Sequence, residues 1–195
     1  MAGKILILQG HPDSGATHFG HALAAAYAQG ARDAGREVRE LRLASLDIAL
    51  LRSPGAWHHD APAPDIAAAQ EAIAWCDHLV LVFPLWLGTM PALVKAFCEQ
   101  VFRPGFAIDP AAGAGWWKKK LGGRSARIVV TMGMPAIAFT WFFRAHGVKA
   151  LTRNILGFVG FGPIRTTYVG GVGELTPTVA RRWKARLAAL GEAGR

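Results

Sequence analysis

The chain has 195 residues, of which 52% are hydrophobic and 18% charged, a composition that is too apolar for a disordered protein. Its length predicts a single domain over residues 1–195, and the apolar run after Lys4 is too short for a secretory signal, so we expect a cytoplasmic protein. The net charge of +9 favours anionic ligands of any kind, nucleic acid included. The two cysteines lack CxxC spacing and the seven histidines lack metal-ligand spacing, so we expect buried thiols and no metal site.

The hydrophobic periodicity, together with the Gly and Pro residues that separate the periodic segments, predicts strands that alternate with helices along the whole chain. The first, third and fourth predicted strands are almost continuous apolar runs, as strands buried on both faces of a parallel sheet require. The fold class is therefore α/β, a doubly wound five-stranded parallel sheet with helices on both faces. The predicted strands are 4–9, 37–42, 79–83, 127–131 and 165–170; the helices are 17–34, 65–76, 91–102, 141–154 and 176–190; the loops are 45–64 and 103–115.

The polar loop after the first predicted strand is the most informative segment. It leads into a predicted helix, whose first backbone N–H groups can bind an anion. His11, Ser14, Thr17 and His18 add side-chain donors. The loop matches neither GxGxxG nor GxxxxGK[ST], which disfavours a standard dinucleotide fingerprint and a Walker loop. We expect a phosphate-bearing ligand here; the alternative is an ordinary turn in which Thr17 only caps the helix.

Two further loops follow predicted strands, at 83–88 and 131–135. Both combine apolar side chains with a Gly and a Pro, which suit a flat aromatic ring held by stacking and backbone hydrogen bonds. The alternative for each loop is structural, with Pro84 ending a strand and Gly133 relieving a turn. Because the carboxyl ends of parallel strands meet at one edge of the sheet, the three loops together favour a nucleotide-like cofactor.

A basic and aromatic stretch at 116–120, WWKKK, is the one segment that suggests a nucleic-acid contact. It lies just before a predicted strand, where a solvated crossover loop is the commoner structure. We therefore expect no specific nucleic-acid partner.

Several stretches of the chain resemble the NAD(P)H:quinone oxidoreductases of flavodoxin-like fold, a family that also includes ancillary subunits of glutathione-gated potassium efflux systems. The resemblance covers about residues 4–170, and the pattern FPLxxxxMPALxK at 83–95 carries most of its specificity. The other matching stretches are His11-Pro12, Phe19 with His21-Ala22-Leu23, and Val101-Phe102 with Gly105-Phe106-Ala107.

The resemblance implies a tightly bound flavin and a homodimer with each active site at the subunit interface. We expect FMN, because the chain is short and shows no adenine-binding segment, with FAD as the alternative. The family's phosphate loop maps onto His11, Thr17, His18 and Phe19, and its flavin-ring loops map onto Pro84, Leu85, Trp86, Leu87, Thr131, Met132, Gly133 and Met134.

The chain departs from the family's pattern at four positions. A Tyr and a His that stabilise charge on the reduced flavin in better-studied members map onto Phe139, which has no hydroxyl, and onto His146, which is displaced by one residue. His146 is the candidate catalytic residue, and a helix-surface histidine is its alternative. Gly20 and Leu87 stand where Asn and an aromatic residue are common, which implies a differently shaped pocket.

The predicted activity is transfer of two electrons from NAD(P)H, by a ping-pong mechanism, to quinones or similar flat electrophiles. One alternative is a regulatory flavoprotein subunit of a membrane efflux system. Another is a flavodoxin-type electron carrier, which the charge of +9 opposes because such carriers usually present an acidic face. The aromatic run Trp141, Phe142 and Phe143 suits a substrate pocket, a dimer interface or the core.

Overall fold

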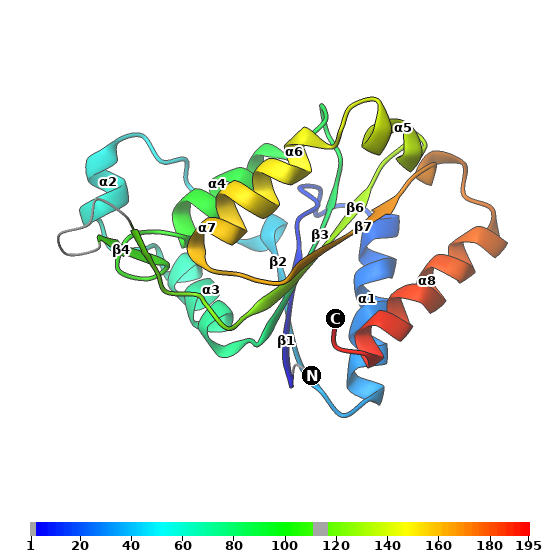
Figure 1. The fold of residues 1–195 in the computed structure, drawn as a ribbon, viewed down its shortest axis with the longest axis horizontal. Helices are drawn as coiled ribbons and strands as arrows, with labels where there is room; N and C mark the ends of the chain where they lie inside the picture. Colours follow the sequence, from blue (N-terminus) through cyan, green and yellow to red (C-terminus); the bar gives the residue numbers. More distant parts are fainter. Residues whose placement is uncertain (1–2, 111–116) are drawn as a thin grey trace.

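The computed structural model describes residues 3–110 and 117–195 and contains a five-stranded parallel sheet in the order β2-β1-β3-β6-β7 (Figure 1). This confirms the predicted fold class, and all five predicted strands are present. The order reverses between β1 and β3, which makes the carboxyl ends of these strands the expected ligand site. The strands are β1 (Lys4–Gln9), β2 (Glu37–Arg42), β3 (His78–Pro84), β6 (Ser125–Thr131) and β7 (Ile164–Val169).

Helices cover both faces of the sheet, because alternate residues of each central strand face opposite sides. On one face, Ile5, Ile7 and Val80 pack against α1 (Phe19–Asp33) and α8 (Pro177–Glu192). On the other face, alternating strand residues such as Leu6 and Leu79 pack in the larger core cluster. The helical segments that contribute to this second cluster include α3 (Pro64–Trp75), α4 (Ala92–Val101), α5 (Ala136–Trp141), α6 (His146–Lys149), η2 (Ala150–Leu156) and α7 (Gly157–Val159).

Two glycines allow α1 and α8 to meet backbone to backbone. A Cβ atom placed on Gly30 would lie 2.1 Å from the carbonyl oxygen of Ala188, and one on Gly191 would lie 2.1 Å from the carbonyl oxygen of Tyr27. Atoms cannot approach this closely, so both positions require glycine if the two helices keep this distance.

The helix starts differ slightly from those expected. The first helix begins at Phe19 with His18 at its N-cap, so the interpretation of Thr17 as a cap is wrong. Helix α3 begins at Pro64, one residue before the expected start, and the Asp65 carboxylate accepts a hydrogen bond from the Asp47 N–H at 2.8 Å.

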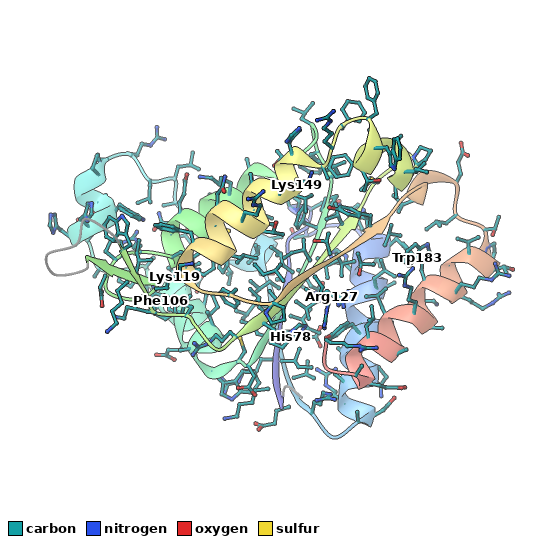
Figure 2. All side chains as sticks on the ribbon, in the orientation of Figure 1. His78, Phe106, Lys119, Arg127, Lys149 and Trp183 are labelled. Carbon is teal, nitrogen blue, oxygen red and sulfur yellow. The ribbon has the colours of Figure 1, made fainter. Side chains whose placement is uncertain are left out.

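The two predicted loops contain regular structure. In 45–64, α2 (Pro54–His59) begins where the Ser53 hydroxyl accepts a hydrogen bond from the Ala56 N–H. In the second region, β4 (Ile108–Pro110) pairs antiparallel with β5 (Trp117–Lys119), and residues 111–116, including Trp116, lie outside the described residues. The basic stretch is therefore partly a strand and not the expected crossover loop. Its Lys119, labelled in Figure 2, donates a hydrogen bond to the Gly157 carbonyl.

The predicted helix 141–154 is broken. Helix α5 (Ala136–Trp141) precedes the break, and the helical segment α6–η2–α7 follows it. Arg144 and Ala145 lie between them with φ values of 52° and 50°, a left-handed conformation that ends one helix and reorients the next. Neither residue type signals a break, which explains why the periodicity suggested one continuous helix.

Both cysteines are buried free thiols, as predicted. Burial raises the pKa of Cys76 and of Cys98 to about 12, so neither is a reactive thiolate at neutral pH. Among residues 3–110 and 117–195, no helix is both long and apolar enough to cross a bilayer, and no cluster of three or more potential ligands could hold a metal ion.

Candidate functional site

The three loops at the carboxyl edge of the sheet enclose a cavity of about 260 Å³, which we call the central cavity. It gathers residues from the loop after β1, the loop after β3 and the loop after β6. The predicted residues that line it are His11, His18, Phe19, Pro84, Leu85, Trp86, Thr131, Met132 and Gly133; Gly20 and Val172 also line it. Of the remaining predicted binding residues, Thr17 lines a neighbouring cavity, and Leu87 and Met134 line neither.

Backbone hydrogen bonds link the end of β6 and its loop to the segments that follow β3 and β7. The Leu85 N–H donates to the Thr131 carbonyl at 2.7 Å, and the Val172 N–H donates to the Met132 carbonyl at 3.1 Å. In the described part of the chain, the backbone N–H groups of Gly133 and Met134 have no protein acceptor. A Cβ on Gly133 would meet no atom within 4 Å, so a ligand has room to approach this backbone.

Trp86 and Leu87 form a tight turn at the rim of the central cavity. The Trp86 and Thr89 backbones exchange two hydrogen bonds of 3.0 Å, and Leu87 has φ 48°. The Trp86 ring, 48% exposed, stands edge-on to His11 with 5.9 Å between ring centroids. The Leu87 side chain is fully exposed, so the structure does not place it in the cavity with its predicted partners.

A network around Asp13 fixes the loop after β1. The Asp13 carboxylate accepts hydrogen bonds from the Gly15 N–H at 2.8 Å and from His18 Nε2 at 2.7 Å. His11 stacks on His18 with 3.6 Å between ring centroids. The hydrogen bond from His18 is the main reason why the pKa of Asp13 is lowered, with the Gly15 N–H second.

His11 and His21 are held in defined tautomers. His11 Nδ1 accepts from the Asp13 N–H at 3.1 Å, and His21 Nδ1 accepts from the His18 N–H at 3.2 Å. Burial lowers the pKa of both rings, and nearby positive charge, from His18 for His11 and from Arg42 for His21, lowers it further. In their neutral form both rings carry the proton on Nε2, which is then a hydrogen-bond donor for a ligand.

His146 lies beside the central cavity without lining it. It is the exposed first residue of α6, and its side chain makes no hydrogen bond or ion pair with the described residues. The next residue packs on the loop after β3, where a Cβ on Gly147 would lie 2.3 Å from the Gly88 carbonyl oxygen. Helix α6 therefore begins against the turn that carries Trp86.

Phe139 is a core residue. It is buried and packs edge-on against Tyr168 with 5.8 Å between ring centroids. It does not line the central cavity. In contrast, Trp141 and Phe142 are 83% and 81% exposed, and Phe143 is half-exposed. The core interpretation of this aromatic run is therefore wrong, and none of its members lines the central cavity.

Sequence reasoning placed Gln9 at the first strand end but missed Arg42 and Ser45, which line a second cavity beside the loop after β1. Gln9 ends β1, Arg42 ends the neighbouring strand β2, and both line this cavity together with Ser45. The same strand-end rule that identified the other loops would have found Arg42, had the second strand been included.

Comparison with known proteins agrees with this geometry. The Flavodoxin_2 family model, described as a flavodoxin-like fold, matches residues 3–192. This chain belongs to that family. Relatives named as NAD(P)H dehydrogenases (quinone) confirm its resemblance to the NAD(P)H:quinone oxidoreductases.

Among the relatives, NAD(P)H dehydrogenase (quinone) 1 of Cavia porcellus is 30% identical over 134 residues, which cover 64% of this chain and 47% of that protein. The ribosyldihydronicotinamide dehydrogenase-like protein traD of Penicillium crustosum is 27% identical over 124 residues, which cover 60% and 44%. This family member thus spans about half the length of the curated relatives that it matches.

Solved structures of similar fold match the whole chain. NAD(P)H:quinone oxidoreductase from Methanothermobacter marburgensis has a TM-score of 0.80 at 19% identity and covers 100% of both chains. An FMN-dependent NADH-azoreductase from Bacillus anthracis, solved in complex with FMN, has a TM-score of 0.75 at 13% identity, with 97% and 98% coverage. At these identities the likeness confirms the flavodoxin-like fold of this family member.

Proposed function

We propose that the chain is a flavoenzyme that binds FMN and passes two electrons from NAD(P)H to quinones or similar flat electrophiles. The observation that carries this proposal is the central cavity, in which three sequence-distant loops place most of the predicted binding residues together. Relatives named as quinone dehydrogenases and an FMN-bound neighbour of similar fold support it.

The residues present fit a flavin. Leu85, Trp86 and Met132 offer apolar walls for a flat ring, and the N–H groups of Gly133 and Met134 offer hydrogen bonds without a protein competitor. Helix α1 is fifteen residues long, and its N-terminus at Phe19 directs backbone N–H groups toward the site expected for the phosphate. FAD would use the same loops, and the FMN-bound neighbour of similar fold supports FMN.

A bound flavin would supply the hydride chemistry, and the protein would supply orientation and electrostatics. The N–H groups of Gly133 and Met134 would stabilise negative charge that develops on a bound flavin. Leu85 and Trp86 would exclude water from it. NAD(P)H and the electron acceptor would use the same space in turn, which would give ping-pong kinetics.

The absorption spectrum is the decisive test. The purified protein should show the two-banded yellow spectrum of a bound flavin, and the bands should bleach when NADPH is added without oxygen. A protein that takes up neither FMN nor FAD would contradict the proposal. A stable one-electron form during stepwise reduction would favour the electron-carrier alternative.

We further place the enzyme in the cytoplasm as a homodimer. The exposed aromatic side chains of Trp141 and Phe142, in the segment that leads into α6, support an interface near the site. The regulatory alternative assigns the same face to a membrane efflux protein. Quinone turnover by the free protein favours the enzyme, whereas cofactor-dependent association with a membrane fraction favours the regulatory subunit.

His146 is the candidate catalytic donor, and a substitution tests it. We expect His146→Gln to lower kcat for quinone reduction by about tenfold, less than the loss of a well-placed oxyanion donor, because His146 stands beside the cavity and Phe139 offers no partner hydroxyl. Stopped-flow absorbance at the flavin band measures the effect. Arg144→Gln, which removes a second exposed cation from the same segment, is the control and should leave kcat unchanged. Equal rates in all three proteins would make His146 a surface histidine.

A further inference from the structure

The turn at the rim of the central cavity, residues 86–89, has a strained backbone. Its two central residues both have positive φ, 48° at Leu87 and 79° at Gly88, as in a type I′ turn. Asparagine and glycine favour this conformation, whereas leucine rarely adopts it. The Leu87 side chain is fully exposed, so its own packing does not offset the strain. Contacts made by the rest of the turn therefore hold it in place.

The turn is anchored at its base and at its tip. At the base, the Leu85 N–H donates to the Thr131 carbonyl at 2.7 Å, which joins the segment after β3 to the end of β6. At the tip, Gly147 of α6 lies against the turn. A Cβ on this glycine would stand 2.3 Å from the Gly88 carbonyl oxygen and 2.6 Å from Thr89 Cβ. Atoms do not approach this closely, so the contact requires a residue without a side chain at position 147.

The two sides of the contact at Gly147 differ in how firmly they are packed. Ala145 and Val148 of the helical side are 3% and 1% exposed and belong to the larger core cluster. The turn lies on the surface, where Trp86 is about half-exposed and Leu87 fully exposed. A group added at position 147 would therefore displace the turn and leave α6 in place, because moving α6 would open the core.

The position of the turn decides where one wall of the central cavity stands. Trp86 lines this cavity of about 260 Å³, and its ring stands edge-on to His11. A displacement of about 1 Å at such a wall is enough to change the fit of a bound molecule substantially. We propose that Gly147 is a positioning residue, which places the Trp86 wall and thereby sets the fit of the electron acceptor.

This inference rests on the proposed function, because it requires that the acceptor enters the central cavity. Gly147 does not line that cavity, so it acts through Trp86. A flat acceptor that stacks inside the cavity should depend on residue 147. An acceptor that takes electrons without stacking there should not.

The oxidation of the reduced enzyme tests this difference. Flavin-loaded wild type and Gly147→Ala are reduced with dithionite and mixed, without oxygen, with either of two acceptors in a stopped-flow instrument. Menadione is a flat two-ring quinone that takes two electrons and two protons, and ferricyanide is a small anion that takes single electrons without stacking. We expect Gly147→Ala to raise the menadione concentration at half-maximal rate by about tenfold, and to change the rate with ferricyanide by less than about twofold.

The matched control is Gly122→Ala. It adds the same methyl group at a glycine where a Cβ would meet no atom within 4 Å and φ is not positive. This variant should match the wild type with both acceptors. A variant that had only lost stability would react more slowly with menadione and with ferricyanide alike, so the comparison of the two acceptors separates positioning from a general structural defect.

Fluorine NMR tests the position of the turn directly and needs no flavin. The protein is labelled with 5-fluorotryptophan, and the signal that is missing from Trp86→Phe belongs to Trp86. We expect this signal to shift in Gly147→Ala and to keep its position in Gly122→Ala. Circular dichroism checks that each variant is folded.

Several results would overturn the inference. An unmoved Trp86 signal in Gly147→Ala would mean that the turn keeps its place. A shifted signal with unchanged menadione kinetics, or an equal loss with both acceptors, would mean that the turn does not set the fit. A Gly147→Ala protein that does not fold would mean that the helix gives way and not the turn. If the wild type takes up no flavin, the proposed function fails, and the fluorine spectrum still decides whether Gly147 positions Trp86.

Discussion

Replacing Gly30 by alanine should lower the free energy of unfolding by about 3 kcal/mol. In an exposed helix the same change would raise stability by about 0.5–1 kcal/mol, because alanine loses less backbone entropy on folding. Here the new Cβ would lie 2.1 Å from the Ala188 carbonyl oxygen and 2.7 Å from its carbonyl carbon. Helices α1 and α8 would have to separate, and the packing of Leu23 and Leu187 would loosen with them.

Urea denaturation followed by circular dichroism measures this effect. The control is Gly122→Ala, where a Cβ would meet no atom within 4 Å and φ is not positive. That variant should match the wild type within about 0.5 kcal/mol, as surface substitutions usually do. An unchanged midpoint for Gly30→Ala would show that the two helices do not touch through their backbones.

The second large effect is a pH dependence of stability that comes from His78. Its ring is 2% exposed, its Nδ1 lies 2.7 Å from Ser125 Oγ, and Arg127 lies close to it, as the labelled side chains in Figure 2 show. Burial, followed by the positive charges of Arg127, Arg165 and Arg36, lowers the pKa of His78 to about 4. The pKa in the unfolded chain is about 6.5.

The sign follows from proton binding. Above pH 6.5 the ring is neutral in both states, and His78 gives no pH dependence. As the pH falls from about 6.5 to 4, the unfolded state binds a proton that the folded state excludes, so the folded state loses stability. Below the folded pKa of about 4 both states are protonated and the loss levels off. The full loss is about 3 kcal/mol.

Unfolding free energies measured between pH 8 and pH 4 test this expectation. His11 and His21 shift in the same direction, so the wild-type slope contains their contributions, and His78→Leu isolates that of the buried ring. The variant should lose about 3 kcal/mol of the difference between the two ends of the range. An identical slope in both proteins would mean that His78 takes up a proton in the folded state near its ordinary pKa.

The sheet and three of its loops could be predicted because their signals are local. Buried parallel strands appear as apolar runs such as Ile5–Leu8, and the polar or Gly- and Pro-containing segments that follow them mark the ligand edge. The central cavity confirms that the loops after β1, β3 and β6 meet. This prediction needed only the parallel direction of the strands, because parallel strands end at the same edge of the sheet.

The remaining features depend on contacts between distant residues. The second cavity, beside the loop after β1, forms because Arg42 ends the strand that pairs with Gln9, and the strand-end argument did not include that second strand. Arg144 and Ala145 adopt positive φ values although neither is glycine, so the residue types at these positions did not predict the helix break. Phe139 packs on Tyr168, about thirty residues away in the chain, which no periodicity could reveal.

The edge strand β2 also limits how copies of this protein can assemble. Its sequence is EVRELR, and Glu37, Arg39, Glu40 and Arg42 give it charged side chains of both signs. A sheet edge decorated in this way resists pairing with the edge strand of another molecule. Continuous sheets across two subunits are therefore disfavoured at this edge, which also protects the open backbone of β2 from aggregation.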